Sequence, residues 1–134
     1  MALQWDGRKI LAFSAIAEIA TGGVLMLDPR IVVSLLLGTE VVGIAVALGR
    51  CFGIVLIALA LACWPNWQRV DSSRPAVRGM LTYNALIALY LVYLFAVRHH
   101  AGVMLWPAVA LHAGVALLLV QTLRGERRTT EVNQ

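Results

Sequence analysis

The sequence predicts an all-α protein, a four-helix transmembrane bundle with a short extra interfacial helix between the first two spans. Three observations lead to this fold. The 134 residues are 60% hydrophobic and only 13% charged, whereas soluble domains carry roughly 25% charged residues. Four apolar segments reach the length of ~20 residues that crosses a bilayer. Apart from Arg50, the basic residues lie at the ends of these segments, and they form no stripe with aromatic residues, which argues against a nucleic-acid partner.

The first span is expected from about Ile10 to Leu27. Arg8 and Lys9 precede it, and Ala15-Ile16-Ala17 resembles a small-x-small cleavage site, so a cleaved signal peptide is the alternative. The apolar run continues unbroken past that site, and this favours a retained span.

A short helix is expected to follow, between Asp28 and Gly38. Asp28 can cap its amino end, and Pro29 suits the first helical position. The segment is almost entirely apolar and too short to span, so it should lie in the interface or against the bundle.

The other three spans are separated by short polar segments. They are expected from about Val41 to Trp64, from about Gly79 to Val97 and from about Val103 to Leu123. The residues from 65 to 75 form a polar linker, and those from 98 to 102 a tight turn. Residues 1–123 are therefore predicted to be one membrane domain, and residues 124–134 a hydrophilic tail that frays.

The distribution of lysine and arginine predicts the orientation. Eight of these residues lie on the side of both termini, against only Arg30 and Arg98 on the other side. The eight are Arg8, Lys9, Arg69, Arg74, Arg78, Arg124, Arg127 and Arg128. The positive-inside rule then places both termini in the cytoplasm, in what we expect to be a bacterial inner membrane. Trp64, Trp67 and Trp106 fit the aromatic belts of the two interfaces.

Glu18 and Arg50 are opposite charges near the middle of two spans. A charge in hydrocarbon costs at least ~2.5 kcal/mol, so such residues are rare and usually paired or functional. Three interpretations are open: a structural ion pair, contact with a ligand or ion, or separate roles.

Asn84 and His112 add a polar residue to each of the other two spans. At a rise of 1.5 Å per residue, all four lie about 9 to 21 Å inside the membrane, so a common polar interior is expected. Tyr83 and Tyr90 share a face of the third span, as packing residues or as the lining of a cavity. The candidate ligand-binding residues are Glu18, Arg50, Asn84, His112, Tyr83 and Tyr90.

Each polar residue also has an ordinary structural interpretation. His112 can be a hydrogen-bonded interior residue, a group that contacts a ligand or handles protons, or a haem ligand. Asn84 is explained by a hydrogen bond between helices. Cys51 and Cys63 are about 18 Å apart along one helix, too far for a disulfide, and are expected to be buried. No cysteine–histidine cluster or cofactor motif is present, so no metal or cofactor is predicted.

Small residues accompany the polar ones. Ser14, Glu18 and Gly22 share a helical face, and Gly49 and Gly53 form a small-xxx-small pair in the second span. Such residues allow neighbouring helices to approach closely.

Residues 47–53 (ALGRCFG), 79–84 (GMLTYN) and 105–108 (LWPA) give the chain an overall plan that resembles the DoxX-like family of small four-helix bacterial inner-membrane proteins. The resemblance implies an accessory role beside a membrane redox enzyme. Residues 15–19 (AIAEI) are also locally similar to the first helix of the small multidrug resistance transporters. That similarity implies a carboxylate that binds protons or cationic substrates in an antiparallel dimer, but here Arg50 and the charge bias depart from the pattern.

Three functions remain open from the sequence. The first is a non-enzymatic membrane component, either an accessory subunit or a protein that binds a lipophilic molecule such as a quinone or a lipid. The second is a proton-coupled small-molecule transporter that acts as a homo-oligomer. The third is a small membrane enzyme that uses His112 and Glu18 as acid and base.

Overall fold

The structure is a computed structural model that describes residues 7–65 and 73–132. The described residues form five helices and no strand, which confirms the predicted all-α class. The helices are α1 (Gly7–Leu27), α2 (Pro29–Leu37), α3 (Ile44–Ala62), α4 (Ser73–Arg98) and α5 (Leu105–Val132).

Four of these helices are long and apolar enough to cross a membrane. The candidate spans are Gly7–Leu27, Ile44–Ala62, Arg74–Arg98 and Leu105–Gly125, close to the segments predicted from hydropathy. These four candidate spans make the chain a multi-pass membrane protein.

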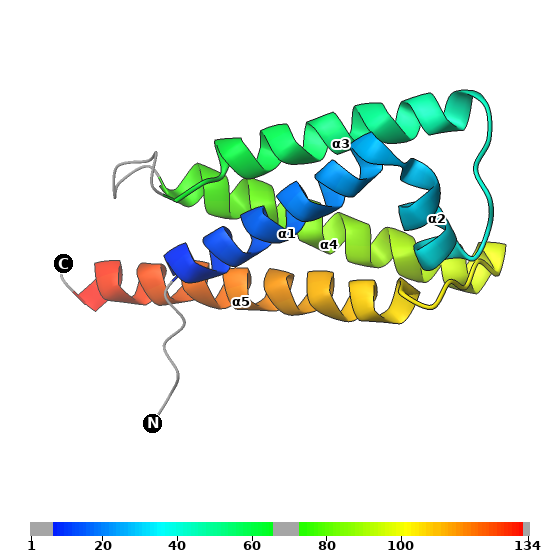
Figure 1. The fold of residues 1–134 in the computed structure, drawn as a ribbon. Coiled ribbons are helices and arrows are strands. Elements are labelled where there is room, and N and C mark those ends of the chain that lie inside the picture. Colours follow the sequence, from blue (N-terminus) through cyan, green and yellow to red (C-terminus); the bar gives the residue numbers. More distant parts are fainter. Residues whose placement is uncertain (1–6, 66–72, 133–134) are drawn as a thin grey trace.

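The bundle is built from two helix pairs. α1 packs most extensively against α3, and α4 packs against α5, while fewer contacts join α1 to α4 and α5. In Figure 1, α1 runs diagonally from beside α5 towards α3, and α2 lies at the far end of the bundle. The start of α1 and the end of α5 lie at the same end of the bundle (Figure 1).

α1 and α3 cross where two glycines face each other. A Cβ atom on Gly22 would lie 2.7 Å from the carbonyl oxygen of Gly53, and one on Gly53 would lie 2.6 Å from the carbonyl oxygen of Gly22. Gly49, one turn earlier on α3, lies against Pro29 of α2. Both members of the predicted small-xxx-small pair therefore allow a close approach.

The short helix α2 begins as predicted, with Asp28 as its N-cap residue. Asp28 Oδ1 accepts a hydrogen bond from the Arg30 amide at 3.0 Å, and Pro29 lies in the first turn. The carboxyl end is fixed to the α4–α5 turn, because the Gly102 and Met104 amides donate to carbonyl oxygens of α2 at 3.0 and 2.8 Å. α2 is thus held against the end of the bundle.

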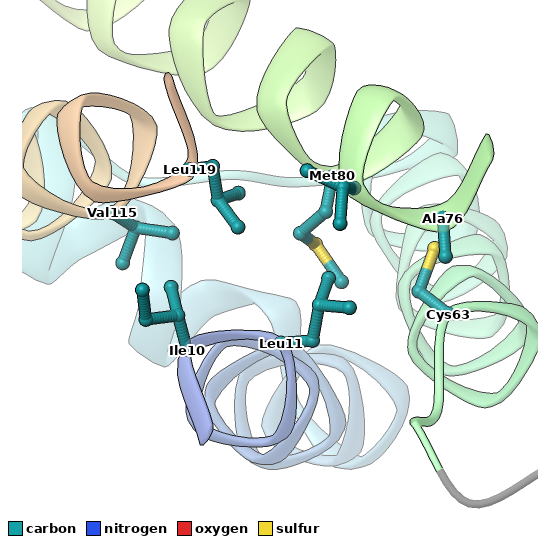
Figure 2. Packing of buried hydrophobic residues seen from close by; sticks show 8 residues of the cluster. Ile10, Leu11, Cys63, Ala76, Met80, Val115 and Leu119 are labelled. Carbon is teal, nitrogen blue, oxygen red and sulfur yellow. The ribbon is translucent and has the colours of Figure 1, made fainter. Parts of the chain in front are cut away.

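An apolar core fills the end of the bundle where α1 begins. Figure 2 shows Met80 of α4 between Leu11 of α1 and Leu119 of α5, with Ile10 and Val115 beside them. Met80 and Leu119 are fully buried. The next turn of each helix carries the polar residues described below.

Two details differ from the sequence expectations. α5 continues to Val132, so the segment from 124 that was expected to fray is helical there. Cys51 is exposed on α3, whereas Cys63 is buried as expected, and both thiols are free. Most of the predicted polar linker, with Trp67 and Arg69, lies outside the described residues.

We expect Gly53→Ala to lower the free energy of unfolding by about 1 to 3 kcal/mol, because the added methyl group meets a backbone oxygen that has little room to move. Gly23→Ala is the matched control: no atom lies within 4 Å of its Cβ position, so only the better helix propensity of alanine should act. Unfolding midpoints in nanodiscs, followed by circular dichroism, compare the two. Equal midpoints would contradict the close crossing.

Candidate functional site

Two polar side chains of α1 are buried one turn apart. Ser14 is 1% exposed and Glu18 is 2% exposed. Residues at this spacing lie on the same face of a helix, and here that face is turned towards α4. The Tyr83 hydroxyl of α4 donates a hydrogen bond to Glu18 Oε2 at 2.9 Å. The hydroxyl group thus provides a polar partner to a carboxylate that hydrocarbon alone would leave unsolvated.

Asn84, the next residue of α4, is completely buried. Its Nδ2 donates to the Met80 carbonyl oxygen at 2.8 Å and to Ser14 Oγ at 3.2 Å. A carbonyl oxygen only accepts hydrogen bonds, so this contact fixes the orientation of the amide. Asn84 Oδ1 then points to His112 Nδ1 of α5, at 2.8 Å. One amide therefore connects α1, α4 and α5.

The His112 ring is only partly buried. It packs edge-on against Tyr83, with ring centroids 5.8 Å apart and an interplanar angle of 81°. Because Asn84 Oδ1 is an acceptor, Nδ1 of His112 must carry the proton of this hydrogen bond. Ser14, Glu18, Tyr83, Asn84 and His112 are called the polar network below.

Arg50 is not part of the polar network. Its side chain is exposed on α3, and among the described residues Glu18 and Arg50 form no ion pair. The face of α3 that meets α1 is centred on Gly53, and Arg50 lies about 60° around the helix from it. α1 and α3 run in opposite directions and cross at Gly22 and Gly53 (Figure 1). Glu18 precedes this crossing by four residues on α1 and Arg50 by three residues on α3, so the two charges lie about 10 Å apart along the bundle as well as on different faces.

The two predicted tyrosines have different environments. Tyr83 joins the polar network, whereas Tyr90 is 56% exposed and stacks on Tyr93 with ring centroids 6.1 Å apart. Tyr90 lies two turns further along α4 than Tyr83, and α1 runs from beside α5 towards α3 (Figure 1). Tyr83 and Tyr90 therefore do not line one common cavity, although they share a face of α4.

Two members of the site were not among the predicted site residues. Ser14 was recognised only as a small residue on the Glu18 face, and the Met80 carbonyl carries no side-chain signal in the sequence. The four-residue spacing of Ser14 and Glu18 is the one signal that could have identified Ser14. Within residues 7–65 and 73–132, no group of three metal-ligating side chains occurs.

Comparison with protein-family models, curated proteins and solved structures finds no match for this chain. The fold and the polar network thus define its class, a small multi-pass helical membrane protein with a hydrogen-bonded polar interior. The resemblance to DoxX-like proteins stays a prediction.

Asn84→Leu should lower the free energy of unfolding by about 1 to 3 kcal/mol, because it leaves Ser14 and His112 without their shared partner in a buried setting. Thr82→Leu, at an exposed position two residues away on α4, is the matched control and should change little. Unfolding by denaturing detergent, followed by circular dichroism, measures both. Equal destabilisation by the two variants would show that the hydrogen bonds of the Asn84 amide do not contribute to stability.

Double-mutant cycles should separate the true partner of Glu18 from the expected one. Glu18→Gln and Tyr83→Phe should be coupled by about 0.5 to 3 kcal/mol, because the two side chains share a hydrogen bond. Glu18→Gln and Arg50→Gln should add within about 0.5 kcal/mol, since they make no contact. Strong coupling to Arg50 with none to Tyr83 would contradict this arrangement.

Proposed function

We propose that this chain is a non-enzymatic component of the bacterial inner membrane that binds the polar head of a lipophilic molecule, a quinone or a lipid, at His112. The observation that carries the proposal is the state of His112 Nε2. In the described part of the chain, Nδ1 is bonded to Asn84 and Nε2 has no partner.

Nε2 is also not fully buried. No fully buried side-chain nitrogen or oxygen atom of the described residues lacks a hydrogen-bond partner. Since Nε2 has no partner there, it keeps some accessible surface on the partly buried His112 ring. His112 belongs to the candidate span Leu105–Gly125, about 10 Å along α5 from Leu105. The surrounding medium at this depth is lipid, so a molecule that reaches Nε2 would itself be lipid-soluble.

The orientation of the His112 ring is fixed before any ligand binds. Asn84 fixes its hydrogen bond on one side, and Tyr83 packs against it edge-on. A site whose side chains are already positioned loses little entropy on binding. The immediate neighbours along α5, Leu111 and Ala113, are apolar, which suits the hydrocarbon part of a quinone or lipid.

The proposal includes a protein partner or a second copy of this chain. Arg50 is exposed within the span Ile44–Ala62, and polar residues within spans usually face a protein interior or partner. An accessory subunit beside a larger membrane complex would satisfy this requirement. The basic residues near both termini support a cytoplasmic location for both ends.

One observation favours the second candidate, a proton-coupled transporter acting as a homo-oligomer. Glu18 is 2% exposed and is paired with a hydroxyl group and not with Arg50. A buried carboxylate without a cation is costly, and binding of a proton or a cationic substrate would offset its charge. The objection that Arg50 neutralises Glu18 therefore no longer applies.

The test is native mass spectrometry of the protein in nanodiscs supplied with phospholipid and with a decyl-benzoquinone pool in both redox states. We expect an added small mass on the wild type, lost in His112→Phe and kept in the control His100→Phe, which lies outside the polar network. Wild-type protein without any added mass would contradict the proposal. Substrate-dependent proton flux in proteoliposomes, abolished by Glu18→Gln, would establish the transporter instead.

A further inference from the structure

The polar network has used almost all of its hydrogen-bond donors internally. The two protons of Asn84 Nδ2 go to Met80 and Ser14, and the Tyr83 hydroxyl proton goes to Glu18. The Nδ1 proton of His112 goes to Asn84 Oδ1. The Ser14 hydroxyl keeps a proton, but Ser14 is 1% exposed and lies behind the fully buried Asn84, so a ligand cannot reach it.

The groups that remain available are acceptors. In a neutral imidazole ring, one nitrogen carries the proton and the other carries a lone pair. Because Nδ1 is the donor to Asn84, Nε2 is the nitrogen with the lone pair. Glu18, when ionised, is also an acceptor only. The accessible atom of the network, Nε2, therefore calls for a partner that donates a hydrogen bond.

We infer that the lipophilic ligand binds through a hydroxyl group that donates to His112 Nε2, so the site selects a quinol-type or phenol-type head and discriminates against the oxidised quinone. This inference rests on the proposed function and deepens it. A quinone presents two carbonyl oxygens, which are acceptors, and would place an acceptor against Nε2. The corresponding quinol presents two hydroxyl donors on the same ring with the same tail.

The chemistry is a binding preference and involves no transfer of electrons. Size, shape and apolar area are nearly equal in the two redox forms, so the difference in affinity reports the hydrogen bond. A net hydrogen bond of this kind corresponds to roughly tenfold in affinity. If His112 instead carried its proton on Nε2, the site would prefer the quinone, whose carbonyl oxygens accept hydrogen bonds.

The experiment compares decyl-benzoquinol, kept reduced under anaerobic conditions, with decyl-benzoquinone by equilibrium dialysis against nanodiscs, with empty nanodiscs subtracted. Wild-type protein should bind the quinol roughly tenfold more tightly. His112→Asn should reduce the preference to about unity, because the asparagine amide can replace Nδ1 as the donor to Asn84 but places no group at Nε2. His100→Asn, the same substitution outside the polar network, should keep the preference.

The outcomes separate the two claims. If the quinone binds as tightly as the quinol or more tightly, or if His112→Asn keeps the preference, the inference is wrong while the proposed function stands. If neither form binds, the inference fails together with the quinone part of the proposed function, and an added phospholipid mass in the native mass spectrum decides the lipid part.

A second measurement needs no ligand. The ¹⁵N chemical shifts of labelled histidine report which ring nitrogen carries the proton, and the sequence contains only three histidines. We expect the His112 signals to show a protonated Nδ1 and an unprotonated Nε2, with this pattern lost in Asn84→Leu. A protonated Nε2 in the wild type would overturn the inference.

Discussion

Hydrogen bonds from Tyr83 and Asn84 of α4 to α1 join the two halves of this bundle. Lipid provides little hydrophobic drive for one helix to associate with another, so packing and hydrogen bonds must do this. Within each pair, α1 with α3 and α4 with α5, packing is extensive. Between the pairs, Asn84 of α4 contacts Ser14 of α1, and its neighbour Tyr83 contacts Glu18 of α1. The bond from Asn84 to His112 lies within the α4–α5 pair. The seam between the two packed pairs therefore combines these polar contacts with the apolar core around Leu11, Met80 and Leu119. The polar contacts tolerate fewer registers than the apolar ones.

The glycine crossing and the polar network depend on each other. Gly22 follows Glu18 by one turn, and its contact with Gly53 sets how closely α1 approaches α3. Glu18 and Ser14, on the preceding turns of α1, bond to Tyr83 and Asn84 of α4. α1 is thus held by backbone packing against α3 and by side-chain hydrogen bonds to α4.

The elements of the fold could be predicted because each depends on local sequence. Hydropathy locates the spans, and Asp28 with Pro29 marks the start of α2 through a cap that involves only adjacent residues. The partners in the site could be predicted only in part. Depth along a helix follows from counting residues, which correctly grouped Glu18, Asn84 and His112, but rotation about the helix axis depends on packing with the other helices. Arg50 differs from Glu18 in both respects, because it lies about 10 Å further along the bundle and is exposed on another face of α3. Tyr83 is the partner that residue counting did not identify.

The two charges inside the spans are accommodated by different physical means. Arg50 lies about 9 Å from the start of α3, and its long side chain can extend along the helix towards the interface. Glu18 is too short for this and is instead enclosed by protein, with the Tyr83 hydroxyl group as its hydrogen-bond partner. A carboxylate kept in this setting costs stability that an apolar residue would not. Proteins commonly retain such costly groups at functional sites. Glu18 and His112 both contact Tyr83, Glu18 through the phenolic hydroxyl group and His112 through an edge-on ring contact. The buried carboxylate and the histidine therefore belong to one connected site.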